Sequence, residues 1–410
     1  MLEYEYSNNI KLDNEINISI YRELMRYKII QKLIKIFIIY VKKLNESYKI
    51  NLIKLFKYNK IYELIQSWCW TQYDNNTEDS TIPYLKNDDY NFNNFVDTVN
   101  FLLKTKLSYN NPIFVLLKKN VSKYLKKSYQ NFKNLANINI PLNKIIINDE
   151  IILSVMYDDR EHKIICSNLL YSRLYNKLKI NNLVSIDNYD IYIFCLIFRY
   201  SYLDSGNQQL AINSNIKYLF KKCNVNFELY GSAINTISDF YCSLWLDIEK
   251  YFGSQGNFFE IEINKGVYWC NPPYLEIIME NTSKKIINIL NNKNDVAFII
   301  TIPVWDIYTK NKELSSITRH VNKHTNQKMH KDYKIYYHLK PFIKDELFIP
   351  KFRIPYFNHK QNKKIFACNT YMILVYNNIN NNVVQCLHNI FNEIVELDKK
   401  NYFINDNVVT

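Results

Sequence analysis

Hydrophobic positions recur at helical intervals in the first third of the chain. Apolar residues are spaced three and four apart between residues 16 and 70, and lysines fill the other faces. The stripe consists of Met25, Ile29, Leu33, Ile36, Tyr40 and Leu44. A polar, acidic stretch over 72–83 predicts a loop, and a further helix is expected between Phe92 and Leu135. The pattern therefore predicts an α-helical domain over residues 1–145.

From about residue 145 the pattern changes to short apolar runs separated by polar segments. Strands are expected at 145–147, 151–155, 224–230, 258–263, 267–270, 296–302 and 371–376, and helices at 234–251 and 275–290. Strands that alternate with helices indicate an α/β fold with a mainly parallel sheet. Such a sheet binds ligands at the carboxyl ends of its strands. A second domain is therefore predicted over residues 146–410.

The composition suggests two explanations for the basic character of the chain. Its 410 residues are 48% hydrophobic, carry a formal net charge of +13 and have a pI near 9. This charge favours a polyanionic partner. However, nearly all the cations are lysines in a chain rich in Asn, Ile and Tyr, which is typical of an AT-rich genome. The composition leaves both explanations open.

Cysteine and charge patterns limit the class of protein. The eight cysteines form no CxxC pair, which predicts reduced, buried thiols and no zinc cluster. His320 and His324 have helical ligand spacing but no obvious third ligand, so no metal is expected. The most apolar stretch, 29–41, contains Lys32 and Lys35 and is too short and too charged to cross a bilayer. No secretory signal is visible, so a soluble protein of the nucleus or cytoplasm is expected.

Asn271-Pro272-Pro273-Tyr274 is the most informative stretch. It follows the apolar run 267–270, which predicts a buried strand. The amide oxygen of Asn271 and the backbone carbonyl of Pro272 are suited to accept both N–H groups of a planar amine. Tyr274 is suited to stack on the ring that carries the amine. The pattern is typical of amino-methyltransferases, and the alternative is a tight turn without chemistry.

Glu228-Leu229-Tyr230-Gly231-Ser232 fits a companion role. Acid-x-aromatic-Gly-Ser at a strand end is similar to the first motif of S-adenosylmethionine-dependent methyltransferases, where small residues let the backbone approach the cofactor. Phe252-Gly253-Ser254 is a second small-residue turn. The alternatives are a plain strand-turn for the first segment and a helix-terminating glycine for the second.

The block from Phe194 to Asp306 resembles the catalytic domain of the phosphorylated-CTD-interacting factor family, which are cap-specific adenosine N6-methyltransferases. The matching segments are 198–200, 205–208, 227–228, 232–235, 251–256, 270–274 and 302–305, with 369–370 further on. The resemblance implies a Rossmann-like class I methyltransferase core over 146–410, preceded by the helical domain. It also implies S-adenosylmethionine as cofactor, no metal, and the cap-adjacent 2′-O-methyladenosine of capped mRNA as substrate.

The resemblance assigns roles to individual residues. The catalytic loop would be Asn271, Pro272, Pro273 and Tyr274, with Tyr274 where the animal members have Phe. The cofactor-binding residues would be Gln208, Glu228, Gly231, Ser232, Asn235, Phe252, Gly253 and Ser254. Arg199 and Trp305 would bind substrate, although an arginine in an apolar run is equally expected to be paired in a core.

Two departures from the family pattern limit what is carried over. Trp68 and Trp70 lack the spacing of the family's WW domain, so binding to the RNA polymerase tail is not expected. The cation-rich stretch 308–339 suits either RNA phosphates or a solvated loop. Another N6-adenine methyltransferase, a protein glutamine N5-methyltransferase, and an inactive paralogue that binds capped RNA are the alternative functions.

Overall fold

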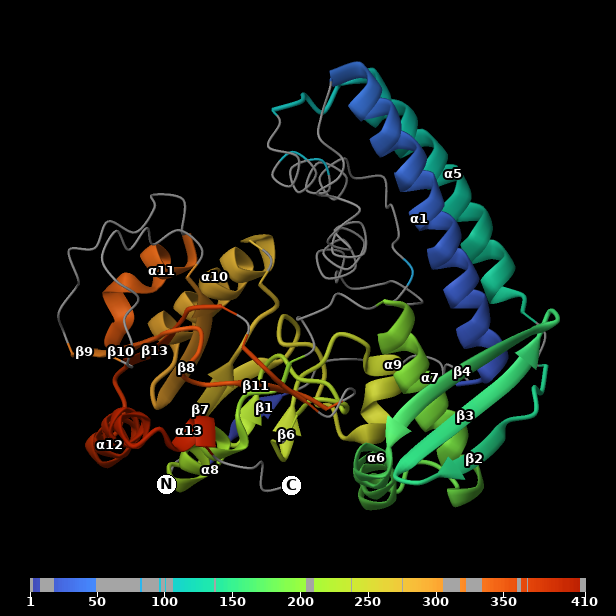
Figure 1. The fold of residues 1–410 in the computed structure, drawn as a ribbon. Coiled ribbons are helices and arrows are strands. Elements are labelled where there is room, and N and C mark those ends of the chain that lie inside the picture. The colour runs from blue at the N-terminus through green and yellow to red at the C-terminus, as the bar shows by residue number, and fades with distance from the viewer. Residues whose placement is uncertain are drawn as a thin grey trace. The chain divides into compact units, whose positions relative to one another are not determined.

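The computed structural model describes residues 3–7, 18–48, 82, 96, 100, 106–135, 138–203, 210–236, 238–274, 276–304, 318–321, 334–359, 363–366 and 368–405. The chain divides into two compact units (Figure 1). Unit 1 comprises Met1–Asp13 and Asn207–Thr410, and unit 2 comprises Asn14–Gly206. Each unit is described by itself.

Unit 2 combines long helices with a small antiparallel sheet. Its elements are α1 (Ile20–Tyr48), α5 (Pro112–Lys133), β2 (Asn143–Ile147), β3 (Glu150–Tyr157), β4 (Arg160–Ser167), α6 (Asn168–Asn181), η1 (Ile186–Asn188) and α7 (Tyr189–Tyr202). Helices α1 and α5 pack along each other, and β2, β3 and β4 pair in that order. Helix α1 confirms the helix predicted within 16–70 as far as Tyr48, and residues 49–70 lie outside the described part of the chain; α5 confirms a helix within 92–135. The start of α5 is fixed by Asn111, whose side chain accepts a hydrogen bond from the Ile113 amide (3.0 Å).

The division between the units differs from the boundary that the sequence pattern predicts near residue 145. Residues 146–206 group with the amino-terminal helices because α7 packs on α1 and on β4. Tyr27 on α1 illustrates this packing, since its ring lies 5.5 Å from the rings of both Phe198 and Tyr202 on α7. A change of periodicity marks where strands begin, but it does not show which elements those strands pack against.

The described strands of unit 1 form one eight-stranded mixed sheet with the order β6-β5-β7-β8-β13-β10-β9, and β1 pairs with β7 beside this path. The strands are β1 (Glu5–Ser7), β5 (Phe227–Glu228), β6 (Phe240–Tyr241), β7 (Glu262–Cys270), β8 (Val296–Pro303), β9 (Thr318–Val321), β10 (Ile343–Ile349) and β13 (Thr370–Asn377). Neighbours among β6, β5, β7 and β8 are parallel, whereas β13 is antiparallel to both β8 and β10. The α/β class predicted from the sequence is confirmed, but the expectation of a mainly parallel sheet is wrong, because β1, β9, β10 and β13 pair antiparallel to their neighbours.

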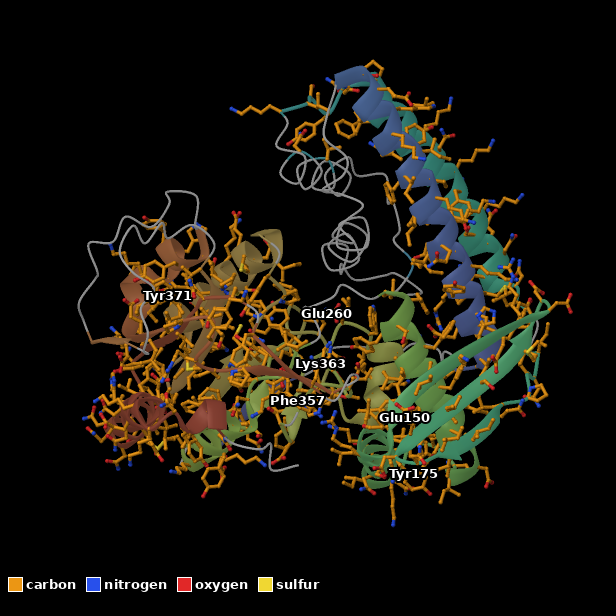
Figure 2. The ribbon with its side chains drawn as sticks, in the orientation of Figure 1. Glu150, Tyr175, Glu260, Phe357, Lys363 and Tyr371 are labelled. Atoms are coloured by element: carbon orange, nitrogen blue, oxygen red, sulfur yellow. A yellow bond between two sulfur atoms is a disulfide. The ribbon has the colours of Figure 1, made fainter. Side chains whose placement is uncertain are left out.

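Helices cover this sheet on both faces (Figure 1). The remaining elements are α8 (Ser214–Lys222), α9 (Leu246–Glu249), η3 (Lys250–Phe252), α10 (Glu276–Asn292), α11 (Lys334–Leu339), η4 (Lys340–Phe342), β11 (Tyr356–Asn358), β12 (Lys363–Ile365), α12 (Asn381–Lys399) and α13 (Tyr402–Asn405). Helices α8, α12 and α13 share one apolar core with β7, β8, β10 and β13, which includes Phe220, Trp269 and Phe391. Helix α10 contacts β8 and β13 outside that core and packs with α11. Because both faces are covered, every residue of β8 is buried. Figure 2 shows Tyr371 of β13 within this part of the chain.

The predicted helix over 234–251 is wrong. This segment contains a turn, the short strand β6, and the short helices α9 and η3. The Asn235 side chain accepts hydrogen bonds from Ser232, which stabilises the turn, and Tyr241 pairs with Glu228 in the sheet. Sheet pairing and side-chain capping here outweigh an apolar spacing that would also suit a helix. The strand predicted at 258–263 is also wrong over 258–261, where a turn and a bend precede the continuous strand β7.

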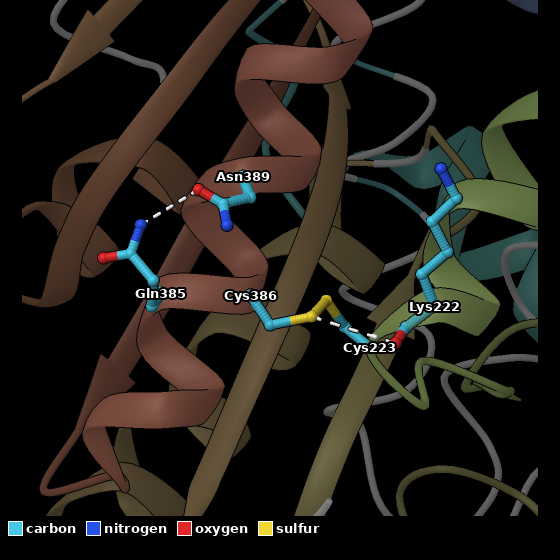
Figure 3. The surroundings of a disulfide bond; sticks show 5 residues. All are labelled: Lys222, Cys223, Gln385, Cys386 and Asn389. Atoms are coloured by element: carbon cyan, nitrogen blue, oxygen red, sulfur yellow. Dashed lines mark hydrogen bonds between the residues drawn. A yellow bond between two sulfur atoms is a disulfide. The ribbon is translucent and has the colours of Figure 1, made fainter.

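The prediction that the cysteines are reduced thiols is wrong for one pair. Cys223 at the end of α8 and Cys386 in α12 form a disulfide with a Cα–Cα distance of 5.8 Å (Figure 3). The two residues are 163 positions apart, so sequence spacing gave no indication of their contact. The free cysteines among the described residues are Cys166, Cys195, Cys242, Cys270 and Cys368. The first four of these are buried, as expected.

Candidate active site

Two predicted motifs meet at one edge of the unit 1 sheet. Strands β5 and β7 are parallel neighbours, with Glu228 aligned beside Trp269. The Leu229 amide donates a hydrogen bond to the Trp269 carbonyl (2.8 Å), which extends this pairing to the strand ends. Glu228–Ser232 and Asn271–Tyr274 both follow directly from these carboxyl ends. The point where the order of a parallel sheet reverses is the usual ligand-binding crevice.

The Asn271–Tyr274 loop is held by hydroxyl contacts. Pro272 is buried, and Asn271, Pro273 and Tyr274 are partly exposed. The Tyr274 hydroxyl donates to the Asn271 amide oxygen (3.3 Å) and lies 3.2 Å from the hydroxyl of Tyr356 on β11. Proline at two consecutive positions restricts the backbone and removes two N–H donors. The Asn271 oxygen is therefore presented by a stiff loop whose last residue is anchored to another element.

Residues of the first motif are paired within their own turn. Glu228 is 3% exposed and accepts a hydrogen bond from the Thr236 hydroxyl (2.7 Å). Ser232 donates from its amide and from its hydroxyl to the Asn235 side-chain oxygen, at 2.8 Å in both cases. These bonds order the backbone after β5 before any ligand binds.

Gly231 lies where the chain passes closest to β6. Its amide donates to the Cys242 carbonyl (2.8 Å). A Cβ atom at this position would lie 3.1 Å from the Tyr241 Cβ and 3.2 Å from the Thr236 Cβ. These separations are tight for a side-chain carbon, so glycine permits the close approach.

The second predicted turn lies beside β6. Gly253 ends η3 with a φ of 97°, a left-handed conformation that favours glycine. Ser254 pairs with Tyr241 in a parallel bridge, and its hydroxyl lies 2.7 Å from that of Ser243. Phe252 is buried. The predicted cofactor residues Phe252, Gly253 and Ser254 are thus brought to the strand edge next to Gly231.

Two buried residues near this edge were missed by sequence reasoning. Glu249 is fully buried and accepts hydrogen bonds from the Ala233 amide and the Tyr241 hydroxyl, both at 2.9 Å. Asn257 is also fully buried, and its side-chain nitrogen has no hydrogen-bond partner among the described residues. An unused buried donor usually marks a missing partner.

Lys217 contacts residues on both sides of the first motif. Its ammonium group is buried and donates to the Val225 carbonyl (3.1 Å) and the Ser238 hydroxyl (2.7 Å). Burial lowers the pKa of Lys217 to about 8, partly opposed by the negative charge of Glu228.

Cavities adjoin the Asn271–Tyr274 loop through Tyr356. One cavity is lined by the sheet residues Thr301, Ile349, Thr370 and Met372 together with Tyr356. A second cavity of about 30 Å³ is lined by Ile212, Asn213, Ser214, Pro355, Tyr356, Phe357, His359 and Lys364. Figure 2 labels Phe357 and Lys363 on the β11–β12 hairpin that forms part of this lining.

Arg199 is not part of this edge. It lies in unit 2, is fully buried, and forms a bidentate ion pair with Glu23 at 2.7 and 3.0 Å. Burial raises the pKa of Glu23, but Arg199 and Arg26 more than offset this effect, and the net pKa lies below the ordinary value. The contacts favour a core ion pair over a substrate ligand.

Some predicted residues lie outside the described part of the chain. These are Gln208, Trp305, Trp68, Trp70 and nearly all of the cation-rich stretch 308–333. Within the described ranges, no group of three or more His, Cys, Asp or Glu residues is placed to hold a metal ion. No helix in those ranges is both long and apolar enough to cross a bilayer.

Comparisons with known proteins match a part of the chain that contains both motifs. A family model described as "Phosphorylated CTD interacting factor 1 WW domain" matches residues 170–338, which include both motifs. The human and mouse proteins named mRNA (2′-O-methyladenosine-N(6)-)-methyltransferase are each 28% identical to the chain over 121 residues. This stretch covers 28% of the chain and only 17% of each relative. Over residues 170–338 the chain is therefore similar to the phosphorylated-CTD-interacting factor family.

Proposed function

We propose that this protein transfers a methyl group from S-adenosylmethionine to an adenosine of capped mRNA. The acceptor atom is N6 of the 2′-O-methylated adenosine next to the cap. One observation carries the proposal. The parallel pairing of β5 with β7 brings the motif expected to bind the cofactor and the motif expected to bind an amine to the same sheet edge. The names of the human and mouse relatives support the choice of RNA adenosine as substrate.

A Rossmann-like class I core is part of the proposal. The parallel set β6-β5-β7-β8, helices on both faces and the reversal of strand order between β5 and β7 support it. In such sheets the crevice at the reversal binds the nucleotide cofactor. Gly231, Ser232, Asn235 and the 252–254 turn would line the cofactor side of the crevice.

The residues of the catalytic loop would orient the amine. An exocyclic amine is a weak nucleophile because its lone pair is delocalised into the ring. When the Asn271 oxygen and the Pro272 carbonyl accept hydrogen bonds from the two N–H groups of the amine, the lone pair of the nitrogen is directed toward the methyl donor. Bound S-adenosylmethionine would supply an electrophilic methyl group, and the C–S bond would break as the N–C bond forms. The proton then lost from the methylated nitrogen is acidic and passes to water, so no strong base is required.

Tyr274 would stack on the adenine ring and limit its rotation. Base–aromatic stacking contributes about 1–3 kcal/mol per base. Trp305 and Gln208 remain predicted substrate and cofactor contacts, respectively.

Methyl transfer to four capped RNAs that differ only in the first base tests the substrate. Radiolabelled S-adenosylmethionine, the full chain and RNAs with and without 2′-O-methylation are incubated together. The proposal predicts label in N6-methyladenosine for the adenosine RNA only, with dependence on the cap. Equal transfer to uncapped RNA or DNA would contradict the cap requirement.

The same assay distinguishes the alternative functions. Label in a protein glutamine would indicate a protein N5-methyltransferase. Absence of transfer together with absence of a calorimetric signal for S-adenosylmethionine would indicate a catalytically inactive RNA-binding protein.

A further inference from the structure

The Tyr274 and Tyr356 hydroxyl groups form a directed chain that ends on Asn271. The Asn271 oxygen can only accept, so the Tyr274 hydroxyl donates its single proton there (3.3 Å). The Tyr274 oxygen is then available to accept from the Tyr356 hydroxyl at 3.2 Å. With the Asn271 oxygen facing Tyr274, the chain of hydrogen bonds runs from Tyr356 through Tyr274 to Asn271.

Tyr356 is well suited to be the fixed end of this chain. It is 8% exposed and lies on β11, next to a backbone pairing in which Phe357 exchanges two 2.9 Å hydrogen bonds with Ala211. Burial raises the pKa of Tyr356 well above its ordinary value, so its hydroxyl stays protonated and able to donate. A buried donor on a paired strand gives the loop a rigid reference point.

The consequence concerns the amide group of Asn271. A side-chain amide presents either oxygen or nitrogen after a 180° rotation, and only the oxygen accepts a hydrogen bond from an amine. Donation from Tyr274 favours the orientation in which the oxygen faces this hydroxyl. A carbonyl oxygen has two lone pairs, so one remains for the substrate.

We propose that Tyr274 and Tyr356 are positioning residues that hold the Asn271 amide with its oxygen toward the reacting amine. This inference rests on the proposed function. It gives the tyrosine at position 274 a role that stacking alone does not require, because phenylalanine would stack equally well.

Tyr274→Phe and Tyr356→Phe test whether the hydrogen bonds from Tyr356 through Tyr274 to Asn271 matter for catalysis. Each variant keeps its ring, so stacking and packing are retained. Loss of one hydrogen bond of about 0.5–1.5 kcal/mol predicts kcat lower by about 3–10-fold with little change in KM for capped RNA. The double variant should be no slower than Tyr274→Phe, because both changes interrupt the same chain. Tyr376→Phe is the matched control, since it removes a hydroxyl that contacts His388 on another part of unit 1.

A binding measurement complements the kinetics. Calorimetry with S-adenosylhomocysteine and with capped RNA beginning with adenosine should give the same Kd for parent and variants, because the proposed effect is on the orientation of the reacting amine and not on binding. Unchanged or higher kcat in both variants would contradict the positioning role of Tyr274 and Tyr356. Failure of the proposed function has a different signature: the parent itself would transfer no methyl group to that RNA.

Discussion

The Leu229 amide donates a 2.8 Å hydrogen bond to the Trp269 carbonyl. Leu229 lies two residues before Gly231, and Trp269 lies two residues before Asn271. The bond therefore links the proposed cofactor turn to the proposed catalytic loop through rigid backbone. A displacement of one strand end would be transmitted to the other.

Asn271→Ala should abolish most methyl transfer while leaving the cofactor bound. The alanine side chain cannot accept a hydrogen bond from the N–H group of the amine. Removal of one oriented polar group of this kind typically lowers kcat by about 10²–10³-fold. Steady-state kinetics and calorimetry with S-adenosylmethionine measure the two effects. Asn389→Ala, an exposed site on α12, is the control. An active Asn271→Ala enzyme would exclude this residue from the chemistry.

Gly231→Ala should weaken cofactor binding. The new Cβ would lie 3.1 Å from the Tyr241 Cβ, so the turn after β5 must shift. Gly266→Ala is the matched control, because its Cβ would lie 2.7 Å from Tyr4 and its φ is 129°, but Gly266 lies in β7 before the strand end. Both variants should lower Tm, and only Gly231→Ala should raise the Kd of S-adenosylmethionine. An equal effect of the two variants on this Kd would contradict the assignment.

The Glu23–Arg199 pair should stabilise unit 2 in a pH-dependent manner. Arg199→Ala would remove the bidentate partner of the buried Glu23 carboxylate, which would keep Arg26 and the Tyr202 hydroxyl as partners. The loss should therefore approach the cost of a broken buried ion pair, about 3–5 kcal/mol. The pKa of Glu23 is lower in the folded protein than its ordinary value of 4.5. Its contribution is therefore fully present above about pH 4.5 and is lost as the pH falls through the folded pKa.

Urea unfolding from pH 3 to pH 7 measures this contribution. The difference in stability between the parent and Glu23→Gln should shrink toward the acidic end. If Arg199→Ala instead retained full stability and lost affinity for capped RNA, the substrate-binding interpretation of Arg199 would be restored.

The Cys223–Cys386 disulfide should persist in protein purified without reductant. Peptide mapping of alkylated protein should recover a cross-linked peptide that contains both residues. Because the bridge closes a loop of 163 residues, Cys223→Ser should lower stability by about 4–5 kcal/mol in the loop-entropy model. Cys368→Ser, which changes a free thiol, is the control. Alkylation of both Cys223 and Cys386 in the native, unreduced protein would contradict the bridge.

The local sequence determined the helices α5 and α10, the strands β8 and β13, and the position of the Asn271–Tyr274 loop after a buried strand. These features depend on apolar periodicity and on proline and glycine, which act within a few residues. The same local signals misassigned 234–251, because an apolar spacing is compatible with a helix or with short sheet-bound segments.

Only the tertiary structure decided which of these segments meet. The neighbouring positions of β5 and β7, the contact of Tyr274 with Tyr356, the burial of Arg199 against Glu23 and the bridge from Cys223 to Cys386 all join residues far apart in the chain. Such pairings depend on strand order and on burial, which minimise the free energy of the whole fold. A motif thus indicates which chemistry is available, and packing determines which groups are close enough to perform it.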